Sequence, residues 1–178
     1  KGDMKTWIAG TYDELQTALM GGEAAALEWG DLRSDNYGHS GYGDTRVYLN
    51  AIDGSQSQYN WENLYSVIDR CNVGIEKFPT IPNLLSADYD DYVGQCYGLR
   101  ALMYFYAIRV WGDVPLVVAT WDGDTETSHV GRSPVREVRA QILSDLDNAI
   151  AMIDGDVSTT RKFYFNRGAA WALKTDVH

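Results

Sequence analysis

Aromatic and hydrogen-bonding residues alternate in the glycine-rich stretch 30–60. Flat rings can stack on the apolar faces of a ligand, while guanidinium, carboxylate and amide groups bind its hydroxyl groups. That combination is the chemistry needed to hold a carbohydrate. The candidate binding residues in this stretch are Arg33, Asp35, Asn36, Tyr37 and Tyr42.

A second candidate is Trp121, which is followed by Asp122 and Asp124 in a polar stretch. For every one of these rings there is an alternative interpretation, because buried Tyr and Trp residues commonly anchor loops onto helices. The rings of Trp29, Tyr48 and Tyr59 and the amide of Asn50 add to the same composition, and the alternative applies to these three rings as well.

Catalysis and metal binding find little support in the sequence. The three histidines are His39, His129 and His178, with no pair at helical spacing and no Gly-x-Ser-x-Gly motif. The run 122–126 imitates the start of a calcium loop, but Thr127 stands where that loop needs glycine. We therefore expect a protein that is not an enzyme and that has no cofactor.

Composition restricts the class of protein further. The 178 residues are 45% hydrophobic and include six Trp, twelve Tyr and four Phe, which is enough apolar material for one folded domain. The longest uninterrupted apolar run, residues 101–108, is too short to span a membrane. A net charge of -10 argues against nucleic acid as a partner, because phosphate binding needs an excess of Lys and Arg.

The two cysteines, Cys71 and Cys96, do not identify a cellular compartment. They could form one disulfide or remain as two thiols. We favour two buried thiols, since free cysteine is among the most buried residue types.

In the first third of the chain, Thr11 and Glu14 fit a capping box, which predicts a helix beginning at Thr11. Gly21 and Gly22 predict a break in that helix. Residues 30–60 are predicted to be loop, with a short helix over 47–52.

Later segments carry clear helical periods. Apolar residues recur at three- and four-residue steps over 61–78, ending at Pro79, and over 88–111, ending at Gly112. Residues 114–119 are predicted to be extended. Ser133 and Pro134 predict the start of a helix that continues to about 153, and a final helix begins near Asn166.

Consecutive helices joined by turns predict an all-α fold of antiparallel helix pairs with long loops, with residues 1–178 in a single helical domain. Such pairs stack in tetratricopeptide-like proteins. No 34-residue period is visible, however, so the spacing alone does not establish a repeat. Arg100 and Arg109 lie in apolar helical stripes, where an arginine usually pairs with a neighbouring acid or carbonyl.

Residues 99–116, Leu-Arg-Ala-Leu-Met-Tyr-Phe-Tyr-Ala-Ile-Arg-Val-Trp-Gly-Asp-Val-Pro-Leu, resemble the best-known signature of the SusD/RagB family of outer-membrane glycan-binding lipoproteins. Residues 61–65 with Asn72 are similar to the family's preceding helix. Residues 132–135 with 142–150 are similar to the next helix, and 167–174 to the one after. The resemblance covers about two thirds of the chain, from Trp61 onward, and is loose over residues 1–60.

This resemblance implies a tetratricopeptide-like fold and an oligosaccharide ligand. It also implies a TonB-dependent outer-membrane transporter as partner and a cell-surface location on the outer membrane. Family members run to several hundred residues, so we expect an incomplete amino-terminal portion of a larger SusD-like fold, with a lipid anchor upstream of Lys1. Gln95 departs from the family pattern, which usually has Glu at this position.

Three hypotheses follow, in decreasing order of support. The first is a glycan-binding protein that works with the transporter in polysaccharide uptake. The second is a helical interaction module that contacts the transporter without its own affinity for sugar, which an exposed apolar patch on the last helix would favour. The third is an α-helical glycoside hydrolase, which would need two carboxylates across a cleft.

Overall fold

A computed structural model of the chain describes residues 2–21, 25–34, 45–51, 53, 55, 59–82, 86–120, 130–155 and 163–178. In chain order the elements are α1 (Gly2–Met20), α2 (Ala25–Trp29), η1 (Asp31–Arg33), α3 (Thr45–Tyr48), α4 (Glu62–Lys77), η3 (Phe78–Thr80), α5 (Ser86–Trp111), β1 (Val114–Pro115), β2 (Arg132–Ser133), α6 (Val135–Met152) and α7 (Arg167–Val177). Most of the described residues are helical and the two strands have two residues each, which confirms the all-α prediction.

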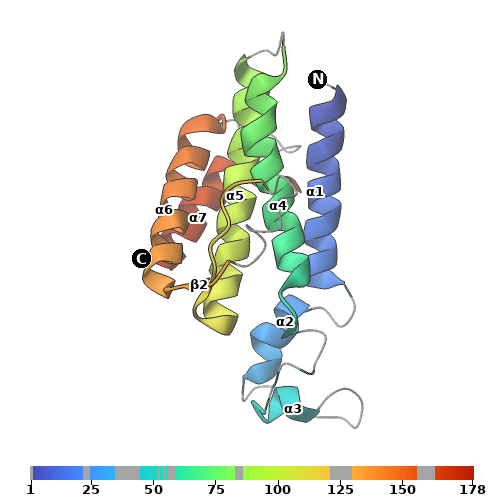
Figure 1. Ribbon diagram of the computed structural model, residues 1–178, viewed down its shortest axis with the longest axis vertical. Coiled ribbons are helices and arrows are strands. Elements are labelled where there is room, and N and C mark those ends of the chain that lie inside the picture. The colour runs from blue at the N-terminus through green and yellow to red at the C-terminus, as the bar shows by residue number, and fades with distance from the viewer. Residues whose placement is uncertain are drawn as a thin grey trace.

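The five long helices lie side by side, and each runs antiparallel to the one before it (Figure 1). Contacts join α1 to α4, α4 to α5, α5 to α6 and α6 to α7. Helix α5 is therefore central, whereas α2 and α3 lie beyond the C-terminal end of α1, at one end of the bundle (Figure 1).

The central position of α5 explains its sequence, which is apolar on several faces. Leu99, Ala101, Met103 and Ala107 are at most 1% exposed, and Tyr104 is the largest fully buried side chain among the described residues. A helix that is covered by neighbours on most sides has no need of a polar face. The predicted helix over 88–111 is confirmed, and Gly112 ends it in the left-handed conformation (φ 74°) that favours glycine.

Helix α1 corrects the prediction that a helix begins at Thr11. The helix already covers Gly2–Met20, and Thr11 is completely buried in its middle. The Thr11 hydroxyl donates to the Trp7 carbonyl oxygen at 2.9 Å, an interaction within the helix and not a cap. Met4 and Ile8 extend the buried face toward the N-terminus, which outweighs the local capping signal. The break at Gly21 agrees with the end of the helix at Met20.

The start of α6 corrects a second capping prediction. Ser133 does not cap this helix, because it lies in β2, where it pairs antiparallel with Val114. The capping group is instead the Asp113 carboxylate, whose Oδ1 accepts a hydrogen bond from the Val135 N–H at 2.9 Å. Asp113, which lies between α5 and β1, thus connects the start of β1 to the first turn of α6.

Other predicted elements agree with the structure. Helix α4 ends at Lys77, followed by η3 with Pro79, and Asn166 caps α7 by accepting from the Ala169 N–H at 2.9 Å. The short helix predicted over 47–52 is found two residues earlier, at Thr45–Tyr48, so only positions 47 and 48 of the predicted range are helical. Cys71 on α4 and Cys96 on α5 are buried free cysteines, as favoured from the sequence. No helix in the described ranges is long and apolar enough to cross a membrane.

Candidate functional site

Of the predicted binding residues, the structure describes Arg33, which lies at the end of η1. Its Nε donates to Asn50 Oδ1 at 2.9 Å, and Asn50 Nδ2 donates back to the Arg33 carbonyl oxygen at 3.4 Å. Asn50 has a left-handed backbone (φ 51°), which places its side chain opposite η1. Arg33 is therefore held against the segment that follows α3, as a partly exposed cation at the end of the bundle.

The other predicted binding residues lie outside the described residues. They are Asp35, Asn36, Tyr37, Tyr42 and Trp121.

Two neighbouring rings that could have belonged to this surface are core residues instead. Trp29 and Tyr59 are each 8% exposed. The Trp29 ring packs edge-on against Trp111, with 5.3 Å between the ring centroids, and Trp61 packs edge-on against Trp111 at 6.1 Å. For Trp29 and Tyr59 the structural alternative, loop anchoring, is therefore correct.

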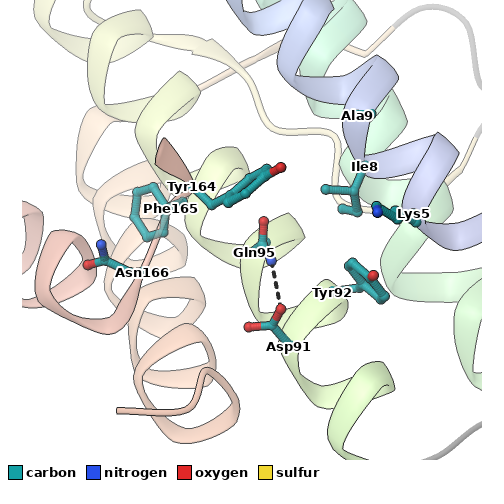
Figure 2. Close-up of a pocket in the computed structure, with 9 residues that line it drawn as sticks. All are labelled: Lys5, Ile8, Ala9, Asp91, Tyr92, Gln95, Tyr164, Phe165 and Asn166. Atoms are coloured by element: carbon teal, nitrogen blue, oxygen red, sulfur yellow. Dashed lines mark hydrogen bonds between the residues drawn. The ribbon is translucent and has the colours of Figure 1, made fainter. Parts of the chain in front are cut away.

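A pocket of about 290 Å³ lies on the side of the bundle, between the N-terminal halves of α1 and α5 and the segment before α7. Figure 2 shows Gln95 and Asp91 in the middle, with Tyr164 on one side and Tyr92, Ile8 and Lys5 on the other. Its described lining residues are Lys5, Ile8, Ala9, Asp91, Tyr92, Gln95, Tyr164, Phe165 and Asn166.

A chain of hydrogen bonds with a fixed direction ends at Asp91 in the pocket. The Phe165 backbone N–H donates to the Tyr12 hydroxyl oxygen at 2.7 Å, so the hydroxyl proton is available to Gln95 Oε1, 2.9 Å away. Gln95 Nε2 then donates to Asp91 Oδ2 at 3.0 Å. Because a backbone N–H can only donate and a carboxylate can only accept, the two ends together determine the donor and the acceptor at each link between them.

Burial keeps this chain intact. Gln95 is 4% exposed, and burial raises the pKa of Tyr12 well above its ordinary value, so its hydroxyl stays protonated. Asp91 thus presents a carboxylate whose orientation is set from α1, α5 and the segment before α7 together.

The aromatic rim of the pocket is exposed but held in place. The Tyr164 side chain is at the surface, and its ring packs edge-on against Tyr12, with 5.3 Å between the centroids and an interplanar angle of 72°. Next to it, Phe165 lies so close to α5 that a Cβ atom at Gly98 would stand 2.1 Å from its ring. A glycine at position 98 is therefore required for this arrangement.

Sequence reasoning missed this pocket because its members are far apart in the chain. Two signals were available. Gln95 departs from the family pattern, and residues 163–165, Phe-Tyr-Phe, place three rings directly before a helix cap. Neither signal by itself indicates which helix the rings will meet.

The pocket and the predicted surface are separate. Positions 91 and 111 on α5 are about 30 Å apart at 1.5 Å per residue, and Trp111 contacts Trp29, which is separated from η1 by one residue. Among the described residues no group of three or more His, Cys, Asp or Glu side chains could hold a metal ion. The imitation of a calcium loop at 122–126 lies outside them.

Known proteins of one family match this chain along nearly its whole length. Residues 7–177 match the model of a family described as SusD-like, starch-binding and associating with the outer membrane. The SusD-like protein P38 of Formosa agariphila is 34% identical over 185 aligned positions, which cover 99% of this chain and 34% of the relative.

Solved structures agree on the fold. A laminarin-binding SusD-like protein superposes with a TM-score of 0.88 at 24% identity, over 99% of this chain and 39% of that protein. NanU of B. fragilis superposes with a TM-score of 0.83 at 27% identity, over 99% and 36% respectively. The chain spans about a third of the length of these relatives. A family match over residues 7–177, together with the all-α arrangement, shows that this chain belongs to the SusD-like family of starch-binding proteins that associate with the outer membrane.

Proposed function

We propose that this protein binds oligosaccharides at the cell surface and passes them to a TonB-dependent outer-membrane transporter, without cleaving them. The observation that carries the proposal is the family match over residues 7–177. A protein of the same fold that is described as a laminarin-binding SusD-like protein supports it. A lipid anchor attached upstream of Lys1 would hold the protein at the outer membrane.

The proposed glycan surface is the end of the bundle that carries Arg33. Its guanidinium is fixed by Asn50 but is still partly exposed, so it can donate to sugar hydroxyl groups without losing its orientation. Asp35, Asn36, Tyr37, Tyr42 and Trp121 are proposed to supply the remaining rings and hydrogen-bonding groups. The acidic net charge favours neutral over anionic glycans as ligands.

Isothermal titration calorimetry on the natural protein tests this function. The ligands are malto-oligosaccharides, laminarin oligosaccharides and a panel of other neutral oligosaccharides. We expect binding of at least one of them, weakened about tenfold or more by Arg33→Ala and by Tyr42→Ala. Arg136→Ala removes an arginine that is 83% exposed on α6 and serves as the control. No binding by the unaltered protein, or equal binding by all variants, would contradict the proposal.

The second candidate, an interaction module without sugar affinity, is favoured by one observation on α7. Trp171 is 55% exposed, with the Lys174 ammonium 5.7 Å from its ring centroid. If this function is correct, the transporter copurifies with the protein, Trp171→Ser weakens that association, and calorimetry shows no heat with any glycan. Heat with a glycan that Trp171→Ser leaves unchanged favours the first function.

A further inference from the structure

The pocket between α1, α5 and the segment before α7 combines features that recognition of a sugar requires. It has exposed and half-buried rings from Tyr92, Tyr164 and Phe165, a fixed carboxylate on Asp91, and a cation on Lys5 at its edge (Figure 2). Rings cover the apolar face of a pyranose, and charged groups form the stronger hydrogen bonds to hydroxyl groups.

The fixed hydrogen bonds at the pocket distinguish it from an accidental depression of the surface. Four groups contributed by three segments are joined in one directed chain, from the Phe165 N–H through Tyr12 and Gln95 to Asp91. A carboxylate whose orientation is fixed before binding loses little freedom when a ligand arrives.

The size of the pocket limits the ligand. A volume of about 290 Å³ is at the lower limit for small-molecule sites, which begin at about 300 Å³. Helices α1 and α5 bound it on two sides, so it can take one sugar residue at the end of a chain and not an internal stretch. The Asp91 carboxylate in the pocket and the net charge of -10 disfavour a uronate or a sulfated sugar.

We propose that this pocket is a second carbohydrate site, about 30 Å from the Arg33 end of the bundle, which binds the terminal residue of a neutral glycan with Asp91 as hydroxyl acceptor and Tyr164 as stacking ring. The inference rests on the proposed glycan-binding function and adds a separate site to it. Gln95 and Tyr12 are positioning residues, since they act on the ligand through Asp91.

The test uses saturation-transfer difference NMR and calorimetry on the natural protein with single neutral sugars. The probes are glucose, galactose, mannose, xylose, fucose and N-acetylglucosamine, with glucuronate and galacturonate as acidic counterparts. We expect at least one neutral sugar to bind in the millimolar range. Asp91→Asn should weaken that binding about tenfold or more, because a charged acceptor becomes neutral while Gln95 keeps an oxygen to donate to.

Matched variants separate the pocket from general effects. Tyr164→Ala should abolish binding, whereas Phe163→Ala, which removes the 84% exposed ring next to it, should not. Glu137→Gln removes a carboxylate on α6 and is the control for Asp91→Asn. Melting temperatures of all variants verify the fold.

Three results would overturn the second site. They are no binding by any neutral sugar, stronger binding by the uronates, or equal binding by Asp91→Asn and the unaltered protein. Oligosaccharide calorimetry with Arg33→Ala distinguishes the two proposals. If oligosaccharides still bind in an Arg33-dependent manner while single sugars do not, only the second site is wrong. If neither oligosaccharides nor single sugars bind, the glycan-binding function itself is wrong.

Discussion

The Arg100 guanidinium on α5 and the Asp145 carboxylate on α6 form a bidentate ion pair in the interior. Nε lies 2.8 Å from Oδ2 and Nη2 lies 2.7 Å from Oδ1, and the two side chains are 4% and 0% exposed. Arg100 Nη1 also donates to Asn72 Oδ1 at 2.8 Å, so α4, α5 and α6 meet at one charge. This confirms that Arg100 pairs with an acid, as its place in an apolar stripe predicted.

The same network holds the chain that leaves β1. Asn72 Nδ2 donates to the carbonyl oxygens of Val117 and Ala119, each at 3.1 Å. The Tyr104 hydroxyl donates to the Val117 carbonyl oxygen at 2.9 Å and accepts from the Val117 N–H at 2.7 Å. Side chains from two helices therefore satisfy the backbone of a segment that pairs with no strand in the part of the chain that the structure describes.

Replacing Asp145 should be strongly destabilising. Asp145→Asn leaves the Arg100 charge buried without its counterion, which costs about 3–5 kcal/mol in the free energy of unfolding. Asp147→Asn on the same helix is the matched control. Asp147 pairs with Lys174 but is 62% exposed, so its loss should change stability by less than about 1 kcal/mol. Urea unfolding followed by circular dichroism measures both, and equal effects would contradict the importance of the buried pair.

Adding one methyl group at Gly98 should disturb the pocket. In Gly98→Ala the new Cβ would meet the Phe165 ring at 2.1 Å, which forces that ring away at a cost of about 1–3 kcal/mol. Gly131→Ala is the control, because a Cβ there has no neighbour within 4 Å. Chemical denaturation gives the two free energies. If Gly98→Ala left the free energy of unfolding unchanged, the segment before α7 would not pack on α5 as described.

Removing the cap of α6 should weaken that helix moderately. Asp113→Ala leaves the Val135 N–H without its acceptor, and loss of an N-cap carboxylate typically costs about 1 kcal/mol. Asp113→Asn retains an oxygen acceptor and should recover most of the loss. Thermal unfolding of the two variants distinguishes this role from a general effect of charge, for which both variants would behave alike.

Stability should decrease at alkaline pH. Burial raises the pKa of Tyr104 to about 12 and raises the pKa of Tyr12 and Tyr65 also, against about 10 in the unfolded chain. Since the folded state keeps these protons longer, their contribution is complete below pH 10 and is lost as pH rises from 10 toward 12. Each such hydroxyl contributes a slope of about 1.4 kcal/mol per pH unit in that window.

Absorbance at 295 nm during a pH titration, combined with circular dichroism, tests this prediction. The buried tyrosines should ionise together with the loss of helical signal, after the exposed ones. Full ionisation of all twelve tyrosines near pH 10, with the helices intact, would be incompatible with the buried hydroxyl groups described for Tyr12 and Tyr104.

The periodic part of the sequence determined the long helices. Apolar spacing over 61–78, 88–111 and 135–153 predicted α4, α5 and α6, because in each case a continuous face must be buried and local stop signals agree with it. The residues at 99–116 also indicated the family, which the comparison confirmed. Short-range signals failed where tertiary packing opposed them. The capping box at Thr11 does not start a helix, because burial of Met4 and Ile8 extends α1 toward the N-terminus. The cap of α6 is not Ser133 but Asp113, which is distant from α6 in sequence but adjacent to its first residue in space.

The pocket was decided by the tertiary structure alone. Nothing local connects Tyr12, Gln95 and Phe165, since their hydrogen bonds span up to 153 positions. Such contacts exist only once α1 and α5 are packed and Gly98 lets the segment before α7 approach. The sequence therefore determined which segments are helices and which family the chain belongs to. The packing of those helices determined which polar groups meet, because hydrogen bonds between distant residues depend on geometry that no local pattern encodes.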